Sequence, residues 1–271
     1  MISSPMAFIG GGNMARALIA GLLRGGHDAK AIVVVEPQAP QREALQAEWG
    51  VHCIAQADAQ LCAAQTVVWA VKPQSFKEAA AAAQPHIQAA LQLSVMAGIR
   101  TDTLAHMLKT ERVVRAMPNT PALIGQGISG LFARPAVSLD ERARIEAVLS
   151  STGETLWLTR EEDLDAVTAL SGSGPAYVFL VIEALVQAAQ KMGLDEKQGL
   201  KLALATFRGA TALALSSPDS PAELRLRVTS KGGTTHAAIT LLEERQVRET
   251  FIQAVQAAQH RAREMGDELA H

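Results

Sequence analysis

The first half of the chain alternates short apolar runs with stretches whose apolar residues recur at helical spacing. The apolar runs are almost continuous, as expected for strands of a parallel sheet, in which both faces are buried. This alternation predicts a doubly wound parallel sheet with helices on both faces. The predicted strands are 6–9, 31–35, 51–54, 66–71, 91–96 and 112–117, and the predicted helices include 13–24, 42–49 and 75–83.

The pattern changes after the sixth strand. Residues 128–132 and 154–158 are predicted to be added edge strands that flank a helix over 140–151. After Glu161 the β pattern ends, and helical stretches are separated by Gly, Pro and Ser signals. We therefore expect an α/β chain with a Rossmann-type doubly wound domain over residues 1–162 and an all-helical domain over 163–271.

The composition narrows the partners that this chain can have. The 271 residues are 48% hydrophobic, enough for a sizeable core. A net charge of -2 gives no overall attraction for nucleic acid or an anionic membrane. The apolar stretch 176–189 is interrupted by Glu183 and is too short to span a bilayer. Because the amino-terminal residues also lack a basic signal-peptide segment, we expect a soluble, cytoplasmic protein.

The cysteines and histidines do not suggest a metal or redox site. Cys53 is predicted at the end of a strand and Cys62 in a helix, and we expect both to be small buried hydrophobes. The seven histidines lack the spacing of metal ligands, so no metal is expected.

A glycine-rich turn joins the first strand to the first helix. Gly10, Gly12 and Ala15 form G-x-G-x-x-A in the strand–turn–helix setting of a dinucleotide site. Gly10 would permit the tight turn, Gly12 would let the backbone approach a pyrophosphate, and Ala15 would keep the helix close to the strand. The helix N-terminus would attract the phosphates, and Asn13 is placed to cap that helix.

The end of the second strand bears on the choice of cofactor. A carboxylate there binds the adenosine ribose hydroxyls of NAD, whereas a basic residue favours the 2′-phosphate of NADP. Glu36 occupies this position, and Arg42 follows six residues later. Glu36 favours NADH or dual use, while Arg42 is either a phosphate ligand or a solvated helix residue, so the preference stays open.

Loops at the carboxyl ends of later strands are expected to line the same crevice. Lys72 follows the fourth strand and either contacts ribose or phosphate or is a surface lysine in a proline turn. Ala97 follows the fifth strand. Asn119 and Thr120 lie between two prolines after the sixth strand, where they would reach the nicotinamide end.

Two segments stand out in the helical half. In Ser171-Gly-Ser-Gly-Pro-Ala-Tyr177, Pro175 suits the first turn of a helix and the preceding Ser and Gly suit its cap. Val228-Thr-Ser-Lys-Gly-Gly-Thr-Thr235 leads into a helix, and its Gly-Gly pair would present successive N–H groups suited to a carboxylate. Each segment taken alone is also compatible with an ordinary loop and helix start.

Taken together, five segments spread over nearly the whole chain resemble those of pyrroline-5-carboxylate reductases. They are Phe-Ile-Gly-Gly-Gly-Asn-Met, Val-Lys-Pro-Gln, Met-Pro-Asn-Thr-Pro, Gly-Ser-Gly-Pro-Ala-Tyr and Val-Thr-Ser-Lys-Gly-Gly-Thr-Thr. The resemblance implies reduction of 1-pyrroline-5-carboxylate to L-proline with NADPH or NADH, the last step of proline biosynthesis. It also implies a dimer formed through interleaved C-terminal helices, with the active site at the interface, and in many members a ring of dimers.

The resemblance also assigns roles to residues. Thr235 is similar in position to the hydroxyl donor to the ring nitrogen and is the candidate catalytic residue, while Lys231 stands where the family usually has proline. The implied substrate-binding residues are Ser230, Gly232, Gly233, Thr234 and Thr235. The implied cofactor contacts are Gly10, Gly12, Asn13, Met14, Glu36, Ala70, Val71, Lys72, Ala97, Pro118, Asn119 and Thr120.

The reaction requires few side chains, because the cofactor supplies the hydride and the protein supplies orientation and electrostatics. This agrees with the lack of a His–Asp pair, a Ser–His triad or a metal cluster in the sequence. A β-hydroxyacid dehydrogenase is an alternative, but the helix from Pro175 carries only Lys191, at its far end. A non-catalytic dinucleotide sensor is a second alternative, which the ordered substrate loop disfavours.

Overall fold

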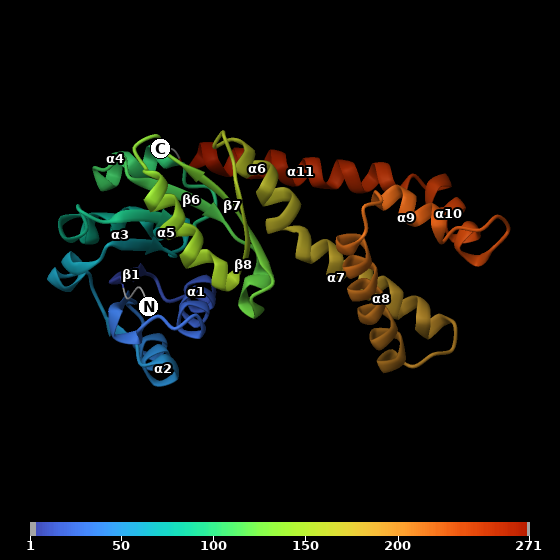
Figure 1. Ribbon diagram of the computed structural model, residues 1–271, viewed down its shortest axis with the longest axis horizontal. Helices are drawn as coiled ribbons and strands as arrows, with labels where there is room; N and C mark the ends of the chain where they lie inside the picture. Colours follow the sequence, from blue (N-terminus) through green and yellow to red (C-terminus); the bar gives the residue numbers. More distant parts are fainter. Residues whose placement is uncertain (1–3, 270–271) are drawn as a thin grey trace. The chain divides into compact units, whose positions relative to one another are not determined.

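A computed structural model describes residues 4–269 and divides into two compact units. Unit 1 comprises the chain up to Ser173 together with the residues from Ala258 onward, and unit 2 comprises Gly174–Ala257. Figure 1 colours both units along the sequence. These units differ from the sequence-based domains 1–162 and 163–271, whose boundary stays a prediction.

Unit 1 is built around one eight-stranded sheet in the order β3-β2-β1-β4-β5-β6-β7-β8. Neighbouring strands are parallel except β6 and β7, which are antiparallel. The first six strands therefore confirm the predicted parallel sheet. The strands are β1 Met6–Ile9, β2 Ile32–Val35, β3 His52–Ile54, β4 Thr66–Trp69, β5 Leu91–Ser94, β6 Val113–Met117, β7 Gly127–Ala133 and β8 Gly153–Trp157.

The two strands predicted as additions at the edge of the sheet are present as β7 and β8. They pair in parallel with each other, and β8 takes the outermost position. Gly153 makes this pairing possible, because its φ is +139° and a Cβ there would lie 1.9 Å from the carbonyl oxygen of Gly127. The helix between these strands, α5, is Leu139–Leu149, and it begins with a capping box between Ser138 and Glu141.

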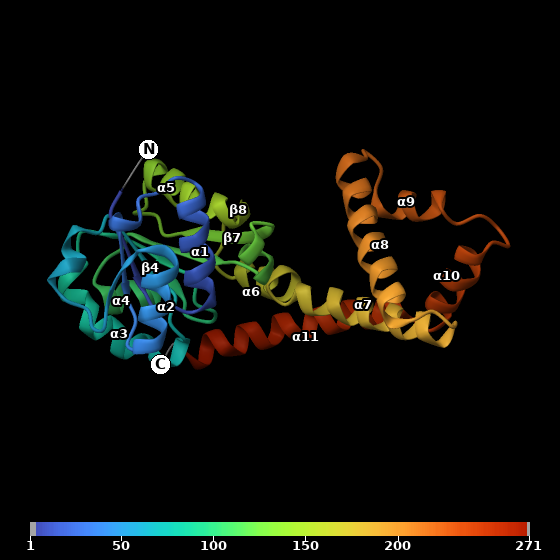
Figure 2. The same ribbon diagram turned by 90° about the horizontal axis from the view of Figure 1, so that it is seen from below.

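Helices cover both faces of the sheet (Figure 2). Successive residues of β1 point to opposite faces, so Phe8 joins one core and Ile9 the other. The helices α1, α2 and α5 pack into the Phe8 core, and α3 and α4 into the Ile9 core, where Trp69 meets Phe76 edge to face at 5.3 Å. Their bounds are α1 Asn13–Arg24, α2 Ala39–Trp49, α3 Phe76–Ala83 and α4 Thr101–Leu108.

The last segment of unit 1 before Ser173 is helical and contains an irregular turn. After α6, Asp163–Val167, comes η7, a π-helical turn over Thr168–Gly172. Pro175 lies in the first turn of the helix that begins at Gly174, as predicted. The cap expected from the preceding Ser and Gly is wrong, because Ser173 has helical backbone angles, φ −84° and ψ −19°, and the Ser171 hydroxyl donates to the Val167 carbonyl one turn earlier.

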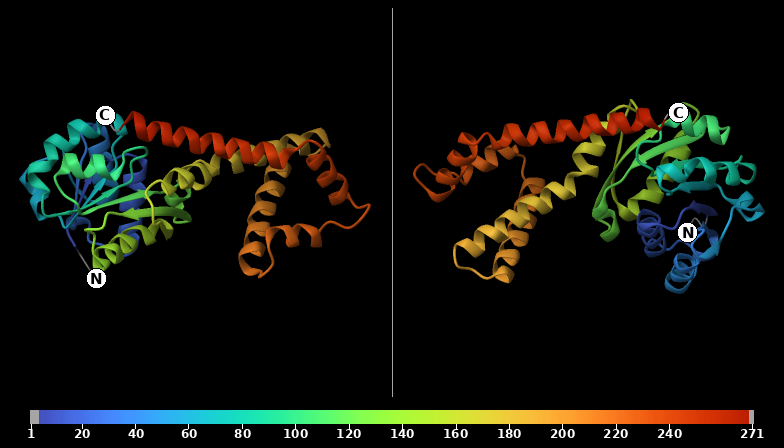
Figure 3. Two further views of the ribbon diagram at one scale, coloured as in Figure 1. Left: turned by 90° about the horizontal axis from the view of Figure 1, so that it is seen from above. Right: turned by 180° about the vertical axis from the view of Figure 1, so that it is seen from behind.

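Unit 2 consists of helices. They are α7 Gly174–Lys191, α8 Glu196–Ser216, α9 Pro221–Arg227, α10 Thr234–Glu244 and α11 Val247–Glu268, the last of which continues into unit 1. Within the unit α7 and α8 pack against each other (Figure 3), closely enough that a Cβ on Gly199 would lie 2.8 Å from the Cβ of Ala189.

The two cysteines have different surroundings. Cys53 is buried in β3, as expected, and burial raises the pKa of its thiol. Cys62 was expected to be buried in a helix, but it is exposed in η2, a short 3-10 turn over Ala59–Ala63. Within residues 4–269, no group of His, Cys, Asp and Glu side chains is arranged to hold a metal ion.

Candidate functional site

The glycine turn after β1 lies against the loop after β4. Gly10 has a φ of +98°, which favours glycine, and its N–H donates to the carbonyl of Val35 at 2.9 Å. A Cβ on Gly10 would lie 2.8 Å from the carbonyl oxygen of Ala70 and 3.0 Å from Val71. The tight turn predicted at Gly10 is thus present, and it adjoins Ala70 and Val71, two further candidate cofactor contacts.

The start of α1 leaves room for an anion. Gly12 is the N-cap residue, and a Cβ there would meet no described atom within 4 Å. The predicted cap by Asn13 is wrong, because Asn13 is already the first helical residue, and among the described side chains none caps this helix. The first turn, which includes Met14, also contains no acidic residue. Uncapped N–H groups beside open space are what a pyrophosphate requires.

Glu36, at the end of β2, supports the glycine turn directly. Its side chain is buried, with 6% of the residue exposed. One carboxylate oxygen accepts the Gly11 N–H and the other accepts the Gln38 N–H, both at 2.9 Å. The Arg42 guanidinium donates to the carbonyls of Glu36 and Pro37 at 2.8 and 2.6 Å. Arg42 is a partly exposed residue of α2, and its Nη1 donates to backbone carbonyls, while a contact with a phosphate stays a prediction.

The other cofactor candidates of unit 1 lie in loops at the carboxyl ends of β4, β5 and β6. Lys72 is exposed at the start of a 3-10 turn. Ala97 follows β5 and precedes Gly98, whose φ is +79°. After β6, Pro118 is buried and Thr120 is exposed. Asn119 uses its side-chain oxygen to accept the Ile128 N–H at 3.0 Å, so part of this side chain fixes the loop itself.

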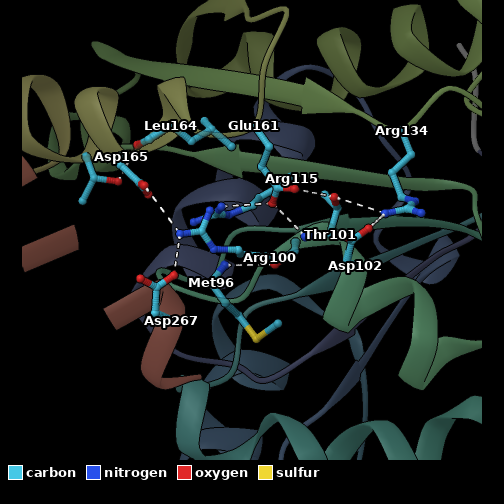
Figure 4. Close-up of polar contacts among 12 residues, drawn as sticks. Met96, Arg100, Thr101, Asp102, Arg115, Arg134, Glu161, Leu164, Asp165 and Asp267 are labelled. Carbon is cyan, nitrogen blue, oxygen red and sulfur yellow. Dashed lines mark hydrogen bonds and ion pairs between the residues drawn. The ribbon is translucent and has the colours of Figure 1, made fainter. Parts of the chain in front are cut away.

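A partly buried ion pair joins β6 to the segment that follows the β5 loop (Figure 4). Arg115, in the middle of β6, donates to Glu161 at 3.1 Å, and the same carboxylate accepts the Thr101 N–H at 2.7 Å. Glu161 thereby connects the start of α4 with β6, and the loop containing Ala97 ends at α4. Sequence reasoning missed this contact, although an arginine within the apolar run of a strand is a signal that a buried partner exists.

An arginine that contacts two aspartates lies near this ion pair. Asp165 is 3% exposed, and its Oδ2 lies 3.9 Å from Arg100, which also pairs with Asp267 at 3.1 Å (Figure 4). Burial raises the pKa of the Asp165 carboxyl, opposed by the charges of Arg100, Arg115 and Arg263. These contacts hold the end of α11 to the segment that starts α4, within unit 1.

The candidate substrate loop lies in unit 2. Gly232 has a φ of +78°, and the Gly233 N–H donates to the Ser230 carbonyl at 3.0 Å. Gly233 is the N-cap of α10, and no described side chain caps that helix. Thr234 and Thr235 are its first two residues. The loop therefore has the predicted form, a glycine turn that leads into a helix N-terminus, and its five candidate residues are brought together.

Comparison with known proteins assigns both units. Residues 161–265 match the family described as pyrroline-5-carboxylate reductase dimerisation. Residues 5–98 match the family described as NADP oxidoreductase coenzyme F420-dependent. A pyrroline-5-carboxylate reductase of Pseudomonas aeruginosa is 42% identical over 271 residues, which cover 99% of each chain. The chain belongs to the pyrroline-5-carboxylate reductase family.

Solved structures of pyrroline-5-carboxylate reductases have the same fold. The enzyme of Coxiella burnetii is 37% identical, with a TM-score of 0.88 over 97% of this chain and 98% of that one. The enzyme of Plasmodium falciparum, solved with NADP bound, is 27% identical, with a TM-score of 0.89 over 98% and 99% of the two chains. The family, expected from five short segments, is confirmed over the full length of the chain.

Proposed function

We propose that this protein reduces 1-pyrroline-5-carboxylate to L-proline by hydride transfer from NADPH or NADH, the last step of proline biosynthesis. Membership of the family over the full chain carries this proposal. The glycine turn supports it independently, because the open space at Gly12 and the uncapped start of α1 fit a dinucleotide phosphate. When bound, the nicotinamide supplies the hydride.

The residues of unit 1 bind and orient the cofactor in this proposal. The N–H groups of Asn13 and Met14 lie in the uncapped first turn of α1 and would hold the pyrophosphate. Lys72 would add a positive charge beside it. The remaining candidates, Gly10, Glu36, Ala70, Val71, Ala97, Pro118, Asn119 and Thr120, would line the adenosine and nicotinamide ends of the same crevice.

The loop before α10 would bind the substrate. The backbone N–H groups of this turn other than that of Gly233, which donates to the Ser230 carbonyl, would hold the carboxylate, a geometry that the left-handed Gly232 permits. Thr235 would donate its hydroxyl to the ring nitrogen. A protonated cyclic imine is already electrophilic, so fixing the ring in orientation lowers the barrier without a dedicated acid or base.

The test of this assignment is Thr235→Ala. We expect kcat/KM to fall about ten- to a hundredfold, equivalent to ~1.4–2.7 kcal/mol of transition-state stabilisation. Thr240→Ala is the matched control, because Thr240 is an exposed threonine on the same helix. Steady-state rates of NADPH oxidation with pyrroline-5-carboxylate measure both variants. Equal kcat/KM values in the two variants would remove Thr235 from the site.

Glu36 leads us to propose that NADH is used at least as well as NADPH. A buried carboxylate at the ribose end of the site suits a 2′-hydroxyl and repels a 2′-phosphate, and one nitrogen of Arg42 already donates to carbonyls. Glu36→Gln keeps an acceptor but removes the charge, so the ratio of KM for NADH to KM for NADPH should rise. An unchanged ratio would mean that cofactor choice is decided elsewhere.

We propose that the chain self-associates as a dimer through unit 2. The residues that match the dimerisation family, 161–265, include the whole of that unit. Phe179 and Leu180 on α7 are 65% and 66% exposed, and a groove of about 520 Å³ beside them is lined by Val186, Leu200 and other residues of α7 and α8. A second copy would cover this surface. Rings of dimers and a cytoplasmic location are parts of the same proposal.

The exposed apolar surface of α7 is also compatible with insertion into a membrane. The helical stretch Asp163–Lys191 is long and apolar enough to cross a bilayer, and 6% of its most apolar window is buried within this chain. Such a stretch occurs in membrane spans and in helices covered by other protein. The dimerisation match over these residues favours cover by a second subunit. A flotation assay with lipid vesicles separates the two, since the proposed dimer stays in the aqueous fraction.

A further inference from the structure

A cavity of about 600 Å³ lies at the end of the sheet opposite the glycine turn. Met6 and Thr66, the first residues of β1 and β4, line it together with the carboxyl end of α1 and one side of α5. The twelve residues of α1 span about 18 Å. Because Gly12 precedes this helix and Gly25 follows it, the cavity is separate from the candidate cofactor site.

Two polar atoms in the cavity wall are buried without a partner. Thr66 is 1% exposed, and its Oγ1 makes no hydrogen bond within the described part of the chain. The same holds for Nε2 of His27, which follows the end of α1. Leaving such groups unsatisfied costs roughly 1–3 kcal/mol each, which favours a small shift of these side chains toward a molecule that carries its own hydrogen-bonding groups.

Two opposite charges line the same cavity and stay apart. Asp140 and Arg144 are four residues apart on α5, a spacing at which an acid and a base usually pair. Within residues 4–269, neither is within ion-pair distance of the other or of any other charged side chain. The carboxyl end of α1 adds partial negative charge on its side of the cavity. Met6 and Leu22 contribute apolar surface to the lining.

We propose that this cavity is a second small-molecule site that binds an α-amino acid with an apolar side chain. The Arg144 guanidinium binds the carboxylate. Asp140 and the last carbonyls of α1 bind the ammonium group, and the side chain packs against Met6 and Leu22. Small shifts of the Thr66 and His27 side chains toward the cavity let their buried polar atoms hydrogen-bond the ligand as well. The volume is within the usual range of ligand pockets, about 300–1,000 Å³.

Isothermal titration of the full chain tests the proposal, with L-leucine and L-phenylalanine as probes. Neither is a substrate or product of the proposed reduction, so a negative result leaves the reductase assignment intact. We expect saturable binding of both. N-acetyl-L-leucine, which lacks the ammonium group, and L-leucinamide, which lacks the carboxylate, should each bind roughly tenfold more weakly than leucine, because each loses one charged contact.

Variants locate the binding. Arg144→Gln should weaken the binding of leucine about tenfold. The affinity of this variant for leucinamide and its basal reductase activity should both stay unchanged. Thr66→Val, which removes the buried hydroxyl at nearly constant volume, should weaken the binding of both leucine and leucinamide. Arg142→Gln is the matched control and should bind leucine normally, because the Arg142 guanidinium lies over the Trp157 ring, 5.2 Å from its centroid.

Two results would overturn the proposal. The first is no heat of binding for either amino acid up to about 20 mM, a concentration at which even a millimolar site is nearly saturated; the cavity then holds water only. The second is equal leucine affinity in the unaltered protein and in Arg144→Gln, which would place any binding elsewhere.

Discussion

The two units differ in how far they bury their apolar side chains. In unit 1 all four residues of β1, of β4 and of β5 are buried, and helices cover both faces of the sheet. In unit 2 Ala189 is the buried residue of the eighteen-residue α7, and Phe179 on the same helix is largely exposed. Unit 1 therefore completes a hydrophobic core from its own chain, whereas unit 2 leaves large apolar side chains exposed, which the proposed dimer would cover.

The glycine turns of the two units also differ in how closely other parts of the chain pack against them. Gly10 and Gly232 both have positive φ, at +98° and +78°. A Cβ on Gly10 would press on the Ala70 carbonyl, while a Cβ on Gly232 would meet no described atom within 4 Å. The first turn is fixed by packing inside its unit. The second is fixed by backbone conformation and stays open on the side where a ligand or a partner would bind.

Adding a charge to the surface of α7 should give the largest effect. We expect Phe179→Glu to weaken dimerisation at least about a hundredfold, or ~2.7 kcal/mol, because an aromatic anchor that the proposed dimer would bury is replaced by an unpaired carboxylate. Leu139→Glu is the control, since Leu139 is 81% exposed on α5 of unit 1. Light scattering coupled to gel filtration measures both. A dimer that survives Phe179→Glu but not Leu139→Glu would reverse the comparison.

Alanine substitutions should separate the two turns. Gly10→Ala should lower the free energy of unfolding by about 2 kcal/mol, because left-handed strain adds to contact with a rigid carbonyl. Gly232→Ala should cost about 1 kcal/mol, from the left-handed strain alone. Urea denaturation provides the values. Equal costs would indicate that the Ala70 loop moves away and that the packing of the first turn is not rigid.

Gly12→Ala should change cofactor binding without changing stability. The added methyl group meets open space in the protein but would occupy the approach to the pyrophosphate. We expect the midpoint of thermal unfolding to stay within about 2 °C and the Kd for NADPH to rise about tenfold, or ~1.4 kcal/mol. Fluorescence titration of NADPH is the measurement. Unchanged affinity would place the pyrophosphate away from this turn.

The smallest effect is expected at Asp165, as a dependence on pH. Because burial raises the pKa of Asp165 above its ordinary value of 3.8, the folded protein binds its proton more tightly than the unfolded chain. Ionisation therefore lowers stability as pH rises through the raised pKa, and this loss is absent below pH 3.8. Asp165→Asn should become more stable relative to the unaltered protein between pH 4 and 7. An opposite trend would mean that the nearby arginines outweigh burial.

Most of the structure around the first glycine turn could be predicted from the local sequence. The strand, the turn and the helix start at Asn13 were all predicted correctly, because backbone geometry there depends on residues close in sequence. The cap was wrong, because Gly12 rather than Asn13 takes the extended conformation that precedes the helix. The strand predicted over 66–71 ends at Trp69, since the apolar run continues into a loop that packs on Gly10.

The contacts of charged side chains, in contrast, depend on residues that are distant in the sequence. Glu36 was predicted as a cofactor contact from its position at a strand end, but its hydrogen bond from the Gly11 N–H, 25 residues away, depends on how β1 and β2 align. The Arg115–Glu161 pair joins residues 46 positions apart, a separation that no local pattern encodes. An isolated arginine in an apolar strand indicates that a partner exists but not which residue it is.

The sequence by itself determined the periodicities that form strands and helices, the left-handed glycines of both turns, and the apolar helices of the second unit, because each depends on neighbouring residues. Only the tertiary structure decided that β8 takes the edge of the sheet, that Glu161 joins β6 to α4, and that Asp140 and Arg144 share a cavity with Thr66. Those arrangements depend on which elements pack together, and packing is a property of the whole chain.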